Sequence, residues 1–99
     1  MDSLSHLKLV LSKGRASTQR VVLESLLRGH ETGRKIAEDT GLSYNKVSIA
    51  LHQLTKYGSI QRVKRGTYKP NERLICLALM DKLIKLENRG RGAAEEAEA

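Results

Sequence analysis

The sequence predicts a mainly α-helical fold with a small β-hairpin, and three observations support this prediction. The apolar residues are mostly Leu, Ile and Val, with no Phe, no Trp and three Tyr, a composition that suits helices packed on helices. Apolar residues recur at helical spacing in five segments that are bounded by Gly, Ser or Asn. One further segment, "SIQRVKRGTYK", places turn residues between two short strand-like runs.

The chain has 99 residues, which is the size of one domain with tails. We expect an N-terminal helix or arm over 1–16, the main domain over 17–70, a C-terminal dimerisation helix over 71–89 and a disordered tail over 90–99. The single cysteine excludes an internal disulfide and a Cys-based metal cage. No apolar run is long enough for a membrane span and no basic leader precedes the first apolar run, so we expect a cytoplasmic protein.

The first two predicted helices are short and amphipathic. The first ends at Gly14, and Ser17 or Thr18 can cap the second, which ends before Gly29. Their apolar stripes, which we expect to lie in the core, are Leu4, Leu7, Val10 and Leu11 in the first, and Val22, Leu23, Leu26 and Leu27 in the second.

Two further helices follow with a short turn between them. The segment "GRKIAEDTG" predicts a helix of about two turns that ends in a left-handed Gly41. Ser43 then caps a helix that runs to Tyr57, and Gly58 ends it. Two helices joined by a turn of three or four residues with a glycine form the helix-turn-helix pattern.

A helical projection separates two faces of the segment 43–57. The buried face consists of Val47, Ala50, Leu51 and Leu54. The opposite face has no acid and consists of Asn45, Ile49, His52, Gln53 and Lys56, flanked by Lys46 and Ser48. Asn and Gln side chains can pair bidentately with adenine, and an aliphatic side chain can contact the methyl group of thymine. This face therefore favours contact with DNA bases.

The segment after Gly58 predicts a two-stranded hairpin. In the first strand Ile60 and Val63 are apolar and the residues around them are polar, and Thr67 and Tyr68 favour the second strand. Gly66 supplies the positive φ that a tight turn requires. The tip "VKRGTYKP" has three bases among its eight residues. Tyr68 can either pack beneath the hairpin or stack on a base, and the pattern favours packing.

The net charge of +7 is unevenly distributed. Residues 1–30 carry +3, residues 31–70 carry +5 and the remainder carries −1. From Ser43 to Pro70 there are six bases and no acid. A long basic stretch without acids is typical of proteins that bind nucleic acid.

The segment "GLSYNKVSIALHQLTKYGSIQRVKRGTYKP" resembles winged-helix DNA-binding proteins, in particular the small regulators of bacteria, archaea or their viruses. The resemblance covers about Thr18 to Pro70 and implies a winged helix-turn-helix with additional N- and C-terminal helices. It implies that Ser43 caps a recognition helix and meets a phosphate. It assigns DNA contacts on that helix to Ser43, Tyr44, Asn45, Lys46, Ser48, Ile49, His52, Gln53 and Lys56. It assigns contacts on the wing to Arg62, Lys64, Arg65, Gly66, Thr67 and Lys69.

The segment "NERLICLALMDKLIKLENRG" predicts a long helix that Asn71 can cap. Its apolar residues spread over about 200°, twice the width of one buried face. We therefore expect a two-fold homodimer, with the interface formed by Leu74, Ile75, Leu77, Leu79, Met80, Leu83, Ile84 and Leu86. The N-terminal helix can either join this interface or cover the long helix within a monomer. Cys76 lies in the same apolar run, so we expect it to be buried rather than to sense redox conditions.

The resulting hypothesis is a homodimeric, sequence-specific double-stranded DNA-binding protein that regulates transcription. We expect no catalytic residues, cofactor or metal, because the sequence has no phosphate-binding glycine loop and its three His are scattered. No small-molecule effector is evident from the sequence, which leaves open whether one exists. One alternative is a winged-helix module that binds proteins in a larger complex. Others are non-specific nucleic-acid binding and RNA binding, which favours exposed aromatic residues for stacking.

Overall fold

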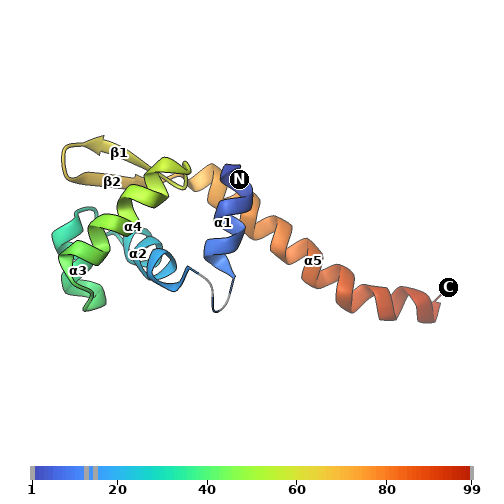
Figure 1. The fold of residues 1–99 in the computed structure, drawn as a ribbon. Coiled ribbons are helices and arrows are strands. Elements are labelled where there is room, and N and C mark those ends of the chain that lie inside the picture. Colours follow the sequence, from blue (N-terminus) through green and yellow to red (C-terminus); the bar gives the residue numbers. More distant parts are fainter. Residues whose placement is uncertain (1, 13, 15, 99) are drawn as a thin grey trace.

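The computed structural model describes residues 2–12, 14 and 16–98, with side chains up to residue 86. The elements in chain order are α1 (Ser3–Leu11), α2 (Ser17–Leu27), α3 (Gly33–Thr40), α4 (Tyr44–Lys56), β1 (Ile60–Lys64), β2 (Thr67–Pro70) and α5 (Glu72–Glu98). The predicted fold class is confirmed: the chain is mainly α-helical, with an antiparallel hairpin between α4 and α5 (Figure 1).

The core lies where α2, α3 and α4 pack on one another, with the base of the hairpin and parts of α1 and α5 at its edges. The predicted inner face of α4 is buried completely, whereas α2 and α5 bury only part of their predicted apolar stripes. The buried apolar side chains are Leu7, Val10, Val22, Leu23, Leu26, Ile36, Val47, Ala50, Leu51, Leu54, Ile60, Ile75 and Ala78.

The first helix lies across the beginning of the last one. Lys8 Nζ lies 2.7 Å from a carboxylate oxygen of Asp81, and Lys82 Nζ donates a hydrogen bond of 3.0 Å to the carbonyl oxygen of Leu11. Beyond this contact α5 extends away from the other helices (Figure 1), so the molecule measures 56 × 24 × 23 Å. Within the described residues, no helix has both the length and the apolar character needed to cross a bilayer.

Three local features differ from the sequence-based expectations. Ala16, in a left-handed conformation with φ of 47°, precedes α2, so Ser17 is the first helical residue rather than a side-chain cap. Leu27, at the end of the same helix, is 50% exposed instead of buried. The backbone of α5 is helical to Glu98, through most of the segment expected to be disordered, because Ala and Glu have high helix propensity.

The ring of His6 on α1 stacks on the ring of Tyr57, which follows α4. The ring centroids are 4.0 Å apart, with 15° between the ring planes. His6 is 5% exposed, and its Nδ1 has no hydrogen-bond partner among the described residues. Burial disfavours the charged imidazolium, so the pKa of His6 lies below its ordinary value of 6.5.

This burial predicts a stability that depends on pH. As the pH falls from 7 to 5, unfolded His6 takes up a proton before folded His6 does, so the free energy of unfolding decreases. One such histidine contributes a slope of at most about 1.4 kcal/mol per pH unit. The carboxyls of Asp39 and Asp81 have pKa values below 3.8 and so titrate below this range.

The measurement is thermal or urea unfolding at pH 7 and pH 5. His6→Phe keeps an aromatic stack and removes the titrating group, so we expect it to reduce the pH dependence. His52→Phe, at an exposed position of α4, is the matched control and is expected to leave the dependence as in the wild type. An equal pH dependence in wild type and His6→Phe contradicts the assignment to His6.

Candidate nucleic-acid interface

The turn between α3 and α4 has the geometry that its sequence predicted. Gly41 ends α3 in a left-handed conformation with φ of 76°, and its N–H donates to the carbonyl of Ala37 at 2.9 Å. Ser43 caps α4, because its hydroxyl oxygen accepts a hydrogen bond of 3.2 Å from the N–H of Lys46. Both caps are confirmed, and they set the direction in which α4 leaves the turn.

A polar cluster holds α3 against α2. The buried hydroxyl of Ser25 donates to Asp39 Oδ2 at 2.7 Å, and Arg28 Nη2 donates to the same oxygen at 2.6 Å. These two hydrogen bonds hold the pKa of Asp39 below its ordinary value of 3.8. Asp39, on α3, is thus engaged with Ser25 and Arg28 rather than with the bases of α4.

The helix α4 presents one buried face and one exposed face, as predicted. Val47, Ala50, Leu51 and Leu54 are buried. The nine side chains of the predicted recognition helix are all exposed: Ser43, Tyr44, Asn45, Lys46, Ser48, Ile49, His52, Gln53 and Lys56.

Two of these exposed side chains also make contacts within the protein. The ring of Tyr44 lies so close to Gly33 that a Cβ atom there would approach it to 3.2 Å. Lys56 Nζ lies 5.8 Å from the centroid of the Tyr57 ring, in cation–π geometry. These contacts restrict the positions of Tyr44 and Lys56 at the two ends of α4.

The hairpin after α4 is antiparallel and contains a bulge. Arg62 pairs with Tyr68 and Lys64 pairs with Thr67, so Val63 is an extra residue in the first strand and is 56% exposed. Gly66 in the turn has φ of 78°, as the sequence predicted. The predicted wing residues Arg62, Lys64, Arg65, Gly66 and Lys69 are exposed, and Thr67 is half-buried.

The second strand of the hairpin is anchored to the segment that precedes α3. The N–H of Tyr68 donates to the carbonyl of Glu31 at 2.9 Å, and Thr32 forms an isolated antiparallel bridge with Thr67. The side chain of Tyr68 is half-buried and packs against the core, as expected. The hairpin therefore has a fixed position beside the beginning of α3.

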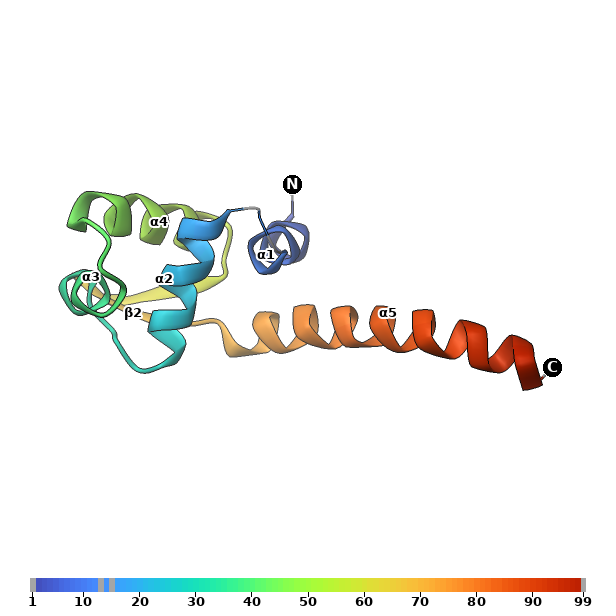
Figure 2. The same ribbon diagram turned by 90° about the horizontal axis from the view of Figure 1, so that it is seen from below.

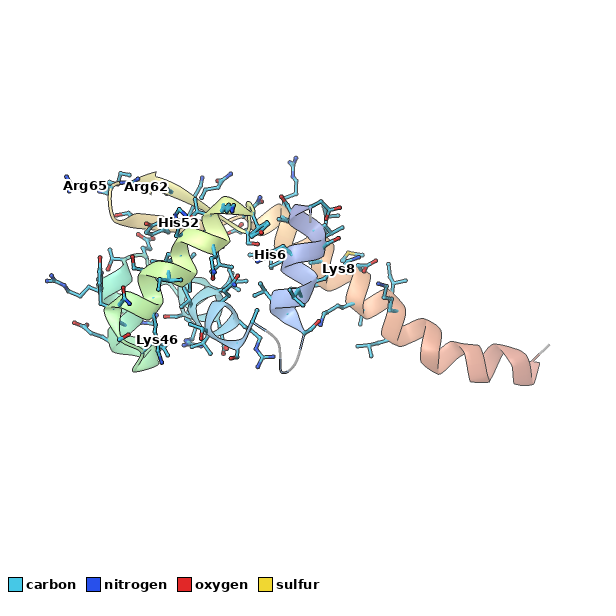
Figure 3. All side chains as sticks on the ribbon, viewed as in Figure 1. His6, Lys8, Lys46, His52, Arg62 and Arg65 are labelled. Carbon is cyan, nitrogen blue, oxygen red and sulfur yellow. The ribbon has the colours of Figure 1, made fainter. Side chains whose placement is uncertain are left out.

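Among the described residues, the bases of α4 and the hairpin form no ion pair with an acid. The ion pairs of the described residues involve Lys8, Arg28, His30 and Lys85, and none involves a base between residues 43 and 70. Figure 3 shows Lys46 near the beginning of α4, His52 farther along the helix, and Arg62 and Arg65 on the hairpin. The exposed bases of this stretch thus come from both α4 and the hairpin, and we call α4 and the hairpin together the basic surface.

Two surface grooves border α4 and add residues that the sequence analysis did not select. A groove of about 440 Å³ separates α4 from the beginning of α2, where Ser17, Thr18 and Gln19 face Lys46 and Gln53.

The other groove, of about 570 Å³, lies between the beginning of α3 and the hairpin turn, with Arg34 and Tyr44 in its wall. Ser17 and Thr18 are distant from the basic stretch in sequence, and Arg34 is close to two acids. No pattern in the sequence therefore indicated that these residues belong to the candidate interface.

The apolar residues predicted for a dimer interface divide into two groups. Ile75 is 4% exposed and lies in the core, and Leu74 is half-buried against it. The other six side chains are between 48% and 63% exposed: Leu77, Leu79, Met80, Leu83, Ile84 and Leu86. The expectation that Cys76 is buried is wrong for the single chain: it is exposed, because α1 covers the opposite side of α5.

Among the described residues, no three His, Cys, Asp or Glu side chains lie close enough together to hold a metal ion. The chain matches no protein-family model, and comparison with curated proteins and with solved structures gave no match.

Proposed function

We propose that the protein binds double-stranded DNA sequence-specifically, as a homodimeric transcriptional regulator of the winged-helix type. The observation that carries this proposal is the acid-free surface of α4 and the hairpin. Every base on it is exposed, and none is paired with an acid within the described residues. Such a surface suits the phosphate backbone, which dominates the affinity of proteins for DNA.

In this proposal α4 is the recognition helix and enters the major groove. An α-helix with side chains is about 10–12 Å wide and the major groove is about 12 Å wide, so one helix fits. Asn45 and Gln53 supply amides that can pair with adenine, and Ile49, 52% exposed, can contact a thymine methyl group. The buried face of α4 fixes the direction in which these side chains point.

The hairpin acts as the wing and contacts the sugar-phosphate backbone or the minor groove. Lys64 and Arg65 lie at its tip, and the anchoring of β2 to residues 31–32 holds the tip beside α4. Such phosphate contacts position the protein but carry little sequence information. Affinity therefore comes from phosphate contacts of the wing and of the end of α4. Discrimination comes from Asn45, Ser48, Ile49 and Gln53.

The homodimer forms through α5 in this proposal. Six large apolar side chains of this helix are exposed, which is unusual for a monomer of this size. Figure 2 shows that α5 extends away from the part of the molecule that contains α4, so pairing along α5 leaves both recognition helices accessible. Two such helices can reach successive major grooves about 34 Å apart on a palindromic site.

The division of roles between wing and helix is tested by two alanine variants. We expect Arg65→Ala to weaken binding to all duplexes and to lower the slope of log affinity against log salt by about one. We expect Asn45→Ala to cost about 1–3 kcal/mol on the preferred site and little elsewhere. The measurement is fluorescence anisotropy on random and selected duplexes across a salt series.

Arg73→Ala is the matched control, because Arg73 is an exposed arginine of α5, outside the basic surface. It is expected to bind DNA like the wild type. The assignment of the DNA-binding surface is wrong if Arg65→Ala and Asn45→Ala also bind every duplex like the wild type. If the chain instead binds an acidic protein and no DNA, the alternative of a protein-interaction module is correct.

A further inference from the structure

The exposed position of Leu27 indicates a contact that a single chain lacks. The spacing of apolar residues in α2 places Leu27 with the core residues Leu23 and Leu26, yet Leu27 is 50% exposed. It lies in the wall of a surface groove of about 240 Å³ between α1, α2 and α5. The residues that line this groove are Leu11, Arg20, Leu23, Glu24, Leu27, Ile75 and Leu79.

This groove is continuous with the exposed apolar face of α5, because Leu79 belongs to both. The six exposed apolar side chains of α5 leave on the order of 600 Å² uncovered, comparable to the largest patches on monomers. A stable protein–protein interface buries about 800 Å² on each partner. The face of α5 alone falls short of this area, and the groove with Leu27 supplies additional area.

We propose that the groove between α2 and α5 receives the end of the apolar stripe of α5 from a second copy, with Leu86 of that copy packed beside Leu27. This inference rests on the proposed homodimer and specifies its geometry. It adds Leu27, on α2, to the interface that the sequence places on α5.

The two-fold symmetry of such a dimer determines how the helices cross. Leu79, at the groove, and Leu86 are seven residues apart, about two turns or 10 Å along α5, and lie on the same side of the helix. In a two-fold interface, a contact from Leu86 to the partner's groove is repeated in the opposite direction. The two α5 helices must then be antiparallel, with the axis midway between these positions, close to Leu83.

Two features favour a second copy over another occupant. The groove and the exposed stripe are both apolar and adjoin each other, so this surface is complementary to itself. The charge is also suitable, because residues 71–99 carry −1 whereas residues 1–70 carry +3 and +5 in their two parts. Two copies that meet along α5 bring nearly neutral segments together, and α5 extends away from α4 and the hairpin, which carry the basic surface (Figure 2).

The test is the oligomeric state of the full chain without DNA, measured by sedimentation over a range of concentrations. We expect the wild type to be a dimer and Leu27→Lys to raise the dissociation constant at least about tenfold, because the lysine charge would be buried in an apolar contact. Val63→Lys is the matched control: Val63 is also apolar and 56% exposed, but it lies on the hairpin, outside α5 and the groove. It is expected to remain dimeric.

A mixture of variants tests the contact between Leu27 and Leu86 directly. Leu86→Glu alone is expected to weaken the dimer. Mixed in equal amounts, Leu27→Lys and Leu86→Glu chains are expected to form heterodimers in preference to either homodimer, since one contact then pairs a lysine with a glutamate and the other stays Leu–Leu.

Three results overturn this interface: a monomeric wild type, a Leu27→Lys variant as dimeric as the wild type, or mixing without preference for heterodimers. Failure here is distinguishable from failure of the proposed function. A wild type that binds DNA as a monomer contradicts the homodimer and this interface, and leaves DNA binding by α4 and the hairpin intact. A dimer with the expected response to Leu27→Lys but without affinity for DNA contradicts the DNA-binding proposal and leaves the interface intact.

Discussion

Leu54→Ala is expected to lower the free energy of unfolding by about 2–5 kcal/mol, the range for large-to-small substitutions at buried sites. Leu54 is 0% exposed on the inner face of α4, where the helix packs against α2 and the beginning of the hairpin. The total stability of a domain is about 5–15 kcal/mol, so this loss is a large fraction of it. The measurement is urea unfolding followed by circular dichroism.

Ile49→Ala is the matched control on the same helix. Ile49 is 52% exposed on the outer face, and surface substitutions usually change stability by about 0.5 kcal/mol or less. Because the proposal assigns Ile49 to a thymine contact, this variant should keep its fold and lose discrimination at one base pair. Similar destabilisation by the two substitutions is incompatible with the two-faced arrangement of α4.

The double charge reversal Lys46→Glu with Arg65→Glu is expected to have the largest effect on DNA binding. It changes one exposed base on α4 and one on the hairpin, and it replaces attraction to phosphates by repulsion at both elements. The affinity of a protein for DNA depends strongly on the number of phosphates that its bases neutralise. We expect a loss on the order of 100-fold or more at low salt, measured by fluorescence anisotropy.

The control for this variant changes the net charge by the same amount at another place. Arg73→Glu with Lys85→Glu alters two exposed bases of α5, outside the proposed DNA-binding surface. It is expected to weaken binding far less, through long-range repulsion that salt screens. If the two double variants lose the same affinity, binding depends on net charge rather than on α4 and the hairpin.

The local structure of the chain could be predicted because it depends on local signals. The cap at Ser43, the left-handed Gly41 and the turn at Gly66 each follow from the conformational preference of one residue. The two faces of α4 follow from its helical period. These features also define most of the candidate DNA-binding surface, which explains why its exposed residues could be selected before the fold was known.

Features that depend on tertiary contacts could not be predicted in the same way. The bridge between Thr32 and Thr67 joins residues far apart in sequence, and a one-residue bridge leaves no periodic pattern. The grooves beside α4 that contain Ser17 and Arg34 arise only when the helices pack.

Burial of Leu27 and Cys76 is predicted by their apolar patterns, yet both are exposed in the single chain. Amphipathic spacing predicts that a side chain is covered but does not identify the surface that covers it. For α5, the sequence correctly indicated an apolar face wider than one chain can bury. The division between the part that α1 covers and the part left exposed required the structure.

The most direct test of the central claim is binding of the wild-type chain to random double-stranded DNA across a salt series, with stoichiometry determined in the same experiment. We predict a linear and steep decrease of log affinity with log salt, and two chains bound at each site. Absence of binding at low salt contradicts the claim that the surface of α4 and the hairpin binds DNA.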